Sequence, residues 1–301
     1  MRHGLLLLDK PAGCTSHDVV QEVRRVIGEK KVGHCGTLDP DATGLLLLTV
    51  GRGTRLTRFL IRAPKVYEGA IRFGQATDTY DASGTVTVEA TTDGLTTESV
   101  SAAMKLFEGE IDQQPPPYCA KKVGGVRFYE LARRGQEVPL KTKRVHVYDF
   151  SAAGELEGDR LRFRLRCASG TYARSLAHEL GQRLGSAAHL VELRRHQIGS
   201  FKVEDALTIA ALATALAEDR STPAFIPFDD IPLPFESIRT DPQQEKRITH
   251  GQTVLVKDAR VGEGDWVKVI NGHNEFVAVG AVIECLGPEG VRVVQPKIVF
   301  K

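Results

Sequence analysis

Residues 33–50, GHCGTLDPDATGLLLLTV, join a polar segment punctuated by three glycines to an apolar run. The run from Leu45 to Val50 is typical of a buried core element. The polar segment carries one histidine and two carboxylates, and it lacks the Walker pattern and the dinucleotide fingerprint that would indicate a phosphate-binding loop. Because Asp before Pro favours turns, Asp39 taken alone is predicted to stabilise a turn ahead of that core element.

The segment before this loop predicts a helix over residues 15–28, TSHDVVQEVRRVIG. Thr15 followed three residues later by Asp18 fits a capping box, and Gly28 suits a helix C-terminus. The apolar face of this helix repeats at Val19, Val23 and Ile27. Since the helix ends at this point, any chemistry carried by residues 29–44 is loop chemistry.

Four segments further along the chain carry local structural signals. Residues 51–53, Gly-Arg-Gly, predict a turn into a basic surface loop, and residues 66–74, VYEGAIRFG, predict a strand. Residues 160–167, RLRFRLRC, alternate strictly and predict a half-buried strand with four arginines on its outer face. The helix predicted after that strand is capped by Ser169 and has one stripe of leucines, namely Leu176, Leu180 and Leu184.

Length and composition bound the class of protein. The chain has 301 residues, 42% hydrophobic and 26% charged, which is ordinary globular composition and about two domains in length. The apolar run Leu5–Leu8 is broken by Asp9 and Lys10, so it predicts neither a signal peptide nor a membrane span, and we expect a cytoplasmic protein. Five cysteines stand singly without metal-ligand spacing, which predicts free thiols and no metal site.

The formal net charge of +2 is distributed unevenly. Residues 121–146 carry 8 basic and 2 acidic side chains, residues 160–202 carry 9 and 2, and residues 203–236 carry 1 and 7. Basic blocks that meet on one face would form a footprint for a polyanion, whereas local ion pairs on a solvated surface are the alternative. Charge alone favours neither interpretation.

Two segments have a composition that suggests their role. Residues 111–139 mix a proline triplet, a glycine pair, basic residues and aromatics, which predicts an exposed arm that meets a negatively charged partner. The acidic, proline-containing stretch 219–235 predicts a linker or a strand edge. The alternating segments that follow it predict a small all-β module of about 65 residues.

Several segments, in order along the chain, closely resemble the TruB family of tRNA pseudouridine synthases. The resemblance covers roughly residues 4–205, and the tail from about residue 236 is more loosely similar to a PUA-type RNA-binding domain through RITHGQ and its strand pattern. The segments that carry the resemblance are LDKPAGCTSHDVV, KVGHCGTLDPDATGLLLLTVGRGTRL, KVYEGAIRFGQATDTYDASG, PPPYCAKKVGGVRFYELARRGQEVP, CASGTYARSLAHELG and VELRRHQIGSF.

This resemblance implies a fold, a reaction and a partner. The fold would be α+β, with a catalytic domain over residues 1–235 built on a mixed, mostly antiparallel sheet and a PUA-like domain over residues 236–301. The reaction would isomerise uridine 55 in the T loop of tRNA: the N1–C1′ bond breaks, the uracil rotates, and C5 bonds to C1′. The resemblance implies no cofactor and no metal. It also implies a monomeric enzyme that grips the T arm with the arm at residues 115–139 and has no membrane partner.

The resemblance also assigns three residues to catalysis. Asp39 matches the family's catalytic aspartate, and an unperturbed carboxylate with a pKa of about 3.9 is ionised at neutral pH. Arg174 matches the arginine that the family pairs with that aspartate; a guanidinium in this place keeps the carboxylate ionised and holds it by bidentate hydrogen bonds. Tyr67 matches the tyrosine that stacks on the target base and helps to remove the C5 proton.

Four further residues are assigned to substrate binding. His34 matches the residue that fills the gap left by the flipped base, a step that costs a few kcal/mol of unstacking. Leu193 matches an apolar wall of the uracil pocket, and Tyr172 lies at the start of the helix that carries the arginine. Lys10, in the first motif, is expected either to support the catalytic loop or to face phosphate.

Two departures from the family and two alternative functions remain open. Cys119 stands where the family usually has Ser, and Asp41 stands where an apolar residue is usual; Asp41 is expected to point to solvent. The alternatives are a non-catalytic RNA chaperone and a guide-RNA-dependent relative that acts within a ribonucleoprotein. Asp39, Tyr67 and Arg174 argue against the first, and the arm argues against the second.

Overall fold

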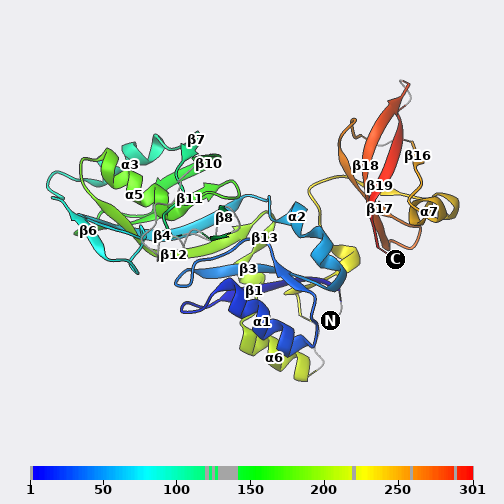
Figure 1. Ribbon diagram of the computed structural model, residues 1–301, viewed down its shortest axis with the longest axis horizontal. Helices are drawn as coiled ribbons and strands as arrows, with labels where there is room; N and C mark the ends of the chain where they lie inside the picture. Colours follow the sequence, from blue (N-terminus) through cyan, green and yellow to red (C-terminus); the bar gives the residue numbers. More distant parts are fainter. Residues whose placement is uncertain are drawn as a thin grey trace.

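The computed structural model describes residues 3–118, 122–123, 126–127, 142–218, 222–257, 260–287 and 290–300. In these parts of the chain the strands form one ten-stranded sheet, one five-stranded sheet and two short two-stranded sheets. Helices pack beside the larger sheet, and the five-stranded sheet lies at the C-terminal end of the chain (Figure 1). The predicted α+β class is confirmed.

The ten-stranded sheet is mostly antiparallel, and its one parallel pairing joins β3 and β12. Two of its strands lie off the main path: β2 (Val32–His34) pairs with β3, and β13 (Phe201–Lys202) pairs with β12. The main path runs β14 (Phe225–Pro227), β1 (Gly4–Lys10), β3 (Thr43–Val50), β12 (Ala188–Ile198), β4 (Lys65–Phe73), β11 (Arg160–Cys167), β10 (Lys143–Ala152) and β7 (Gly109–Gln113).

The helices of this part of the chain form two groups beside the sheet (Figure 1). The first group packs on β1 and β3 and consists of α1 (Ser16–Ile27) and α6 (Ile209–Ala217). The second packs on β4, β10 and β11 and consists of α3 (Thr97–Lys105) and α5 (Ala173–Arg183). The shorter helical turns are η1 (Gly51–Leu56), α2 (Thr57–Leu60), η2 (Val203–Asp205) and η3 (Phe228–Asp230).

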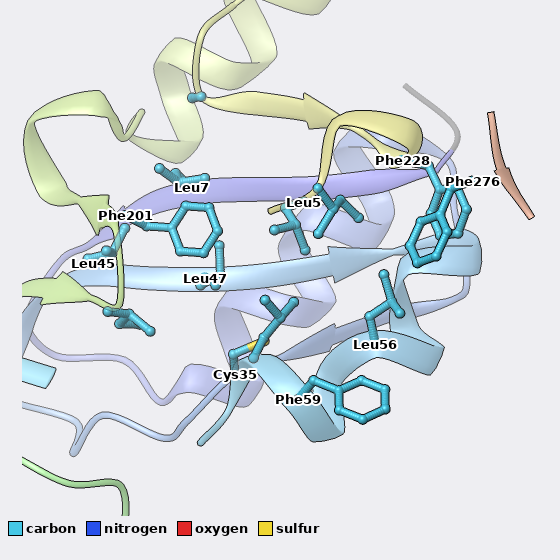
Figure 2. Close-up of a cluster of buried hydrophobic side chains, with 14 of the residues drawn as sticks. Leu5, Leu7, Cys35, Leu45, Leu47, Leu56, Phe59, Phe201, Phe228 and Phe276 are labelled. Atoms are coloured by element: carbon cyan, nitrogen blue, oxygen red, sulfur yellow. The ribbon is translucent and has the colours of Figure 1, made fainter. Parts of the chain in front are cut away.

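The apolar runs of β1 and β3 are buried on both faces, which explains why they are continuous instead of alternating. Odd-numbered leucines of both strands, Leu5, Leu7, Leu45 and Leu47, enter one core cluster (Figure 2). Their even-numbered neighbours enter a second cluster beneath α1 and α6. These two strands therefore form a rigid base for the polar loop that precedes β3.

The five-stranded sheet runs β15 (Ser237–Arg239), β17 (Trp266–Ile270), β18 (Phe276–Leu286), β19 (Val291–Val299) and β16 (Val254–Val256), and α7 (Pro242–Thr249) packs on it. It is joined to the larger sheet by aromatic packing, since Phe228 stacks on Phe276 at 5.0 Å between ring centroids and meets Phe300 edge-on at 4.8 Å. Figure 2 shows Phe228 and Phe276 side by side at the end of the shared core cluster.

Local signals predicted the helices better than the turns. α1 begins with the predicted capping box of Thr15 and Asp18 and ends at Gly28 with a φ of 66°. Residues 51–53 do not form a turn into a loop; they begin η1, which continues into α2, because the backbone after β3 coils immediately over the core. Ser169 does not cap α5, whose N-cap is Tyr172 without a side-chain cap bond.

Two short hairpins complete the described chain: β5 (Gln75–Thr77) with β6 (Val86–Glu89), and β8 (Lys122–Val123) with β9 (Val126–Arg127). Most of the predicted arm at residues 115–139, including Cys119, lies outside the described residues. The stretch predicted as a linker or strand edge contributes β14, which pairs with β1 at the edge of the large sheet.

Candidate active site

A pocket of about 250 Å³ opens beside the loop that carries Asp39. Four segments that are distant in sequence meet there: the loop itself, the start of β4, the turn into α5, and the middle of β12. A larger adjoining hollow of about 870 Å³ shares Asp39, Arg174 and Leu193 with the pocket. The predicted residues that line the pocket are Asp39, Tyr67, Tyr172, Arg174 and Leu193.

Asp39 and Arg174 form an ion pair at the mouth of this pocket. Nη2 of Arg174 donates to Oδ1 of Asp39 at 3.0 Å, and Nε lies 2.9 Å from Oδ2. The arginine side chain is 7% exposed, whereas the carboxylate is 39% exposed and open to the hollow. This geometry fixes the carboxylate but leaves part of it accessible to a ligand.

The other side of Arg174 is held by a loop that sequence analysis did not single out. Nη1 of Arg174 lies 3.1 Å from Oδ2 of Asp81 and donates to the carbonyl of Thr79 at 3.1 Å. One guanidinium is therefore shared between two carboxylates. The motif that contains Tyr67 also contains Asp81, but only the folded chain shows that Asp81 reaches the same arginine.

The surroundings of Asp39 change its ionisation. Burial raises the pKa of this carboxyl above its ordinary value of 3.8; Arg174 opposes the rise, and Asp81 adds to it. The ordinary carboxylate pKa of about 3.9 used in the sequence analysis is that of an isolated group, and the cleft and Asp81 shift it upward here. Asp41 is exposed, as expected.

Strand register places Tyr67 and Leu193 on one wall of the pocket. Tyr67 is paired with Leu165 of β11 and with Arg195 of β12, and Leu193 is paired with Gly69 of β4. A side chain at Gly69 would lie 2.2 Å from the Glu192 carbonyl, so only glycine allows β12 to approach this closely. Burial raises the pKa of the Tyr67 phenol, with Arg195 opposing, so the phenol stays protonated near neutral pH.

Two buried cations support the Asp39 loop from beneath. Lys10, 1% exposed, donates to the carbonyls of Pro11, Pro40 and Ala42 at 2.7–2.9 Å. Arg195, also 1% exposed, donates to the carbonyls of Gly36 at 3.1 Å and Leu45 at 2.8 Å.

These contacts place Lys10 under the loop, because its ammonium is taken up by backbone oxygens. Arg195 was not singled out from the sequence. Its only sequence signal was that it stands two residues after Leu193, because side chains two residues apart in a strand lie on the same face.

The two remaining predicted residues differ in their relation to the pocket. His34 ends β2, is half-buried, and is not among the residues that line the pocket; burial lowers its pKa below the ordinary 6.5, with Arg195 contributing. Tyr172 lines the pocket, and its backbone is fixed by Gln113, which accepts from its N–H at 2.8 Å and donates to its carbonyl at 3.0 Å.

The row of arginines on β11 faces away from the pocket. The alternation is as predicted, with Leu165 on the face of Tyr67 and the arginines on the other face. There Arg162 lies 3.4 Å from Glu192, and Arg164 lies 3.7 Å from Glu68. Arg162 and Arg164 therefore each have an acidic neighbour on the exposed face of β11.

Within the described residues, no group of three or more His, Cys, Asp or Glu side chains is arranged to hold a metal ion. Nor does any helix in the described parts of the chain combine the length and apolarity needed to cross a membrane.

Comparison with protein-family models finds two matches. The model described as the TruB family pseudouridylate synthase N-terminal domain matches residues 24–173, and that described as the tRNA pseudouridylate synthase B C-terminal domain matches residues 174–238. Among curated proteins, the tRNA pseudouridine synthase B of Solibacter usitatus is 44% identical over 281 residues, which is 93% of this chain and 96% of that protein. The protein of the same name from Streptococcus mutans is 40% identical over 257 residues, 84% of this chain and 87% of that protein.

Two solved structures illustrate the similarity of fold. A chain of an H/ACA RNP bound to a substrate RNA containing 2′-deoxyuridine has a TM-score of 0.73 and 26% identity, covering 99% of this chain and 85% of that chain. A chain from a Cbf5-Nop10-Gar1 complex has a TM-score of 0.72 and 28% identity, covering 98% of this chain and 84% of that chain.

Proposed function

Because this chain belongs to the TruB family of pseudouridylate synthases, we propose that it converts uridine 55 in the T loop of tRNA to pseudouridine, with Asp39 as the catalytic carboxylate. The observation that carries the proposal is the Asp39–Arg174 ion pair at the mouth of a pocket walled by Tyr67 and Leu193. The pocket has a volume of about 250 Å³.

The reaction is an isomerisation, so its atoms balance without a co-reactant. The N1–C1′ bond breaks, the uracil rotates in the pocket, a C5–C1′ bond forms, C5 loses its proton and N1 gains one. Attack on C1′, attack on the ring and proton abstraction all require Asp39 in its ionised form. Arg174 favours that form, and its further contacts to Thr79, Asp81 and the Tyr118 carbonyl keep the guanidinium in place.

The substrate uridine must leave its stack to reach Asp39, at a cost of a few kcal/mol. We assign His34, at the end of β2, to the space that the base leaves in the RNA. Tyr67 then stacks on the base, while Leu193 and Tyr172 contribute the walls of the pocket. The Tyr67 phenol stays protonated near neutral pH. Tyr67 therefore acts by stacking and hydrogen bonding, and another group accepts the C5 proton.

Lys10 is assigned to support of the catalytic loop, because its ammonium faces three backbone carbonyls. The five-stranded module that follows residue 235 is assigned to RNA binding as a PUA-like domain. We further propose that the enzyme is a monomer in the cytoplasm. The arm at residues 115–139 would grip the T arm of the tRNA.

A guide-dependent function is the second candidate, because similar folds occur in H/ACA ribonucleoproteins. Relatives named tRNA pseudouridine synthase B, with 37–46% identity, favour the stand-alone enzyme. The purified protein alone, incubated with a T-arm hairpin, separates the two. Pseudouridine formation without any other RNA supports the stand-alone enzyme.

The central test is Asp39→Asn, with Asp41→Asn as the matched control in the same loop. Nucleoside chromatography of the hairpin should show no pseudouridine with Asp39→Asn, near-normal product with Asp41→Asn, and similar hairpin binding by both. Chromatography is needed because the product has the mass of the substrate. Full activity of Asp39→Asn would refute the assignment, and loss of binding as large as the loss of activity would mark Asp39 as a folding residue.

A further inference from the structure

Tyr80 has an unusual backbone conformation next to the catalytic ion pair. Its φ is +64°, and among the described non-glycine residues only Asn274, with a φ of +65°, shares this left-handed region. Asparagine enters this region readily because its short polar side chain hydrogen-bonds locally, whereas a bulky aromatic side chain does not. A tyrosine that remains there must be held by its surroundings.

Contacts to the ring and the backbone of Tyr80 hold it in this conformation. Its ring lies flat on His178 of α5, with 3.8 Å between the ring centroids and 8° between the planes. Its N–H donates to the Thr77 carbonyl at 3.3 Å, and its own carbonyl accepts from the N–H of Leu190 at 3.0 Å. Among these, the stack on His178 is the contact that depends on the tyrosine side chain.

The left-handed turn has a direct consequence at Arg174. The residues on both sides of Tyr80 reach the same guanidinium: the Thr79 carbonyl lies at 3.1 Å from Nη1, and Oδ2 of Asp81 also lies at 3.1 Å. The other oxygen of Asp81 accepts from the Thr79 hydroxyl at 2.7 Å and from the N–H of Ser83 at 3.0 Å. With the chain turned at Tyr80, the loop presents the Thr79 carbonyl and the Asp81 carboxylate to Arg174.

Helix α5 contacts this loop through two residues that are one helical turn apart. Arg174 and His178 are four residues apart and therefore lie on the same face of the helix. Arg174 binds the acceptors on either side of Tyr80, and His178 binds the ring of Tyr80 itself. Tyr80 lines neither the pocket nor the adjoining hollow.

We propose that the Tyr80–His178 stack is a positioning device for catalysis: it holds the turn at Tyr80, the turn holds Thr79 and Asp81 on Arg174, and Arg174 holds Asp39. This inference rests on the proposed role of Asp39. It makes Tyr80 and His178 positioning residues, distinct from the groups that touch the substrate.

The test compares steady-state kinetics of variants on a T-arm hairpin. Tyr80→Ala should lower kcat about tenfold and change KM less than twofold, because Tyr80 lines neither the pocket nor the adjoining hollow. Tyr80→Phe keeps the stack and should retain wild-type kcat. Tyr80→Asn has no ring but favours the left-handed region, so its kcat should lie between those of Tyr80→Phe and Tyr80→Ala.

Variants of the partner and a remote control complete the design. His178→Ala should match Tyr80→Ala, the double variant should be no slower than either single variant, and His178→Phe should restore kcat by keeping an aromatic partner. Asn274→Gly, at the other left-handed position, should leave kcat unchanged. Thermal unfolding of each variant shows whether a loss of kcat merely follows a loss of folded protein.

Two results would overturn the positioning role. One is a folded Tyr80→Ala enzyme with wild-type kcat, and the other is equal activity of the Tyr80→Asn and Tyr80→Ala variants. Both outcomes are measured in enzymes that retain Asp39. An active Asp39→Asn enzyme would instead refute the proposed function, so the two failures can be told apart.

Discussion

Arg174 and Arg164 each lie beside a carboxylate, but the two ion pairs differ in burial and geometry. The Arg174 side chain is 7% exposed and shared by Asp39 and Asp81, with its closest contact at 2.9 Å. Arg164 is 57% exposed and lies 3.7 Å from Glu68. A buried guanidinium interacts strongly and has a fixed position, whereas an exposed one is screened by solvent and contributes little. The same residue type therefore holds a carboxylate of the candidate active site at Arg174 and forms a solvent-exposed pair at Arg164.

The largest expected effect is that of Arg174→Ala. Removing one partner from a buried pair costs about 3–5 kcal/mol, which corresponds to roughly 10²- to 10⁴-fold in rate if the loss is felt in the transition state. Pseudouridine formation on a T-arm hairpin measures kcat/KM for this variant. A loss below tenfold would show that the ion pair is only structural.

The Asp81→Asn variant tests the buried ion pair of Arg174 through the pH dependence of activity. It should lower kcat by roughly tenfold or more at neutral pH, because the ion pair between Asp81 and the buried Arg174 side chain is lost. Burial raises the pKa of Asp39, and the Asp81 charge adds to the rise. Activity requires ionised Asp39, so it should fall as the pH drops through that raised pKa.

Removing the Asp81 charge lowers the pKa of Asp39, so the acid limb of the pH profile should move to lower pH. The Arg174→Ala variant should move the limb to higher pH. A limb that stays in place in both variants would mean that Asp39 is not the group that titrates.

Lys10→Met tests the support of the catalytic loop. It leaves three carbonyls, of Pro11, Pro40 and Ala42, without their charged donor. We expect the free energy of unfolding to fall by about 2–4 kcal/mol, with a smaller effect on kcat. Urea unfolding measures the change, and Lys31→Met, at an exposed position, is the control. Unchanged stability would show that the hydrogen bonds of Lys10 do not stabilise the loop.

The smallest expected effect is that of Arg164→Ala. Its pair with Glu68 is exposed, so both the free energy of unfolding and kcat/KM should change little, the former by about 0.5 kcal/mol or less. The same hairpin assay and urea unfolding measure it. A large loss of RNA binding would show that the outer face of β11 contacts the substrate after all.

Predictions that depend on neighbouring residues in the chain succeeded where the signal was strong. The cap of α1 at Thr15 and the alternation of residues 160–167 both appear as predicted. The prediction for residues 51–53 was wrong because glycines there start a 3₁₀-helix over the core instead of a loop. Ser169 was a reasonable cap by residue type, but the N-cap is Tyr172, three residues later, and the helix begins at Ala173.

The sequence by itself determined the helices α1 and α5, the alternation of β11 and the motifs that place Asp39, Tyr67 and Arg174 in a family. Each of these is set by side-chain periodicity, by caps, or by motif order, which are properties of neighbouring residues.

Only the tertiary structure decided that Asp39 meets Arg174 across 135 residues of chain, that Asp81 shares this arginine, and that Arg195 lies under the loop. It also decided which face of β11 turns away from the pocket. Those outcomes depend on strand register and on burial, and burial determines both the strength of a charge pair and the pKa of its carboxylate.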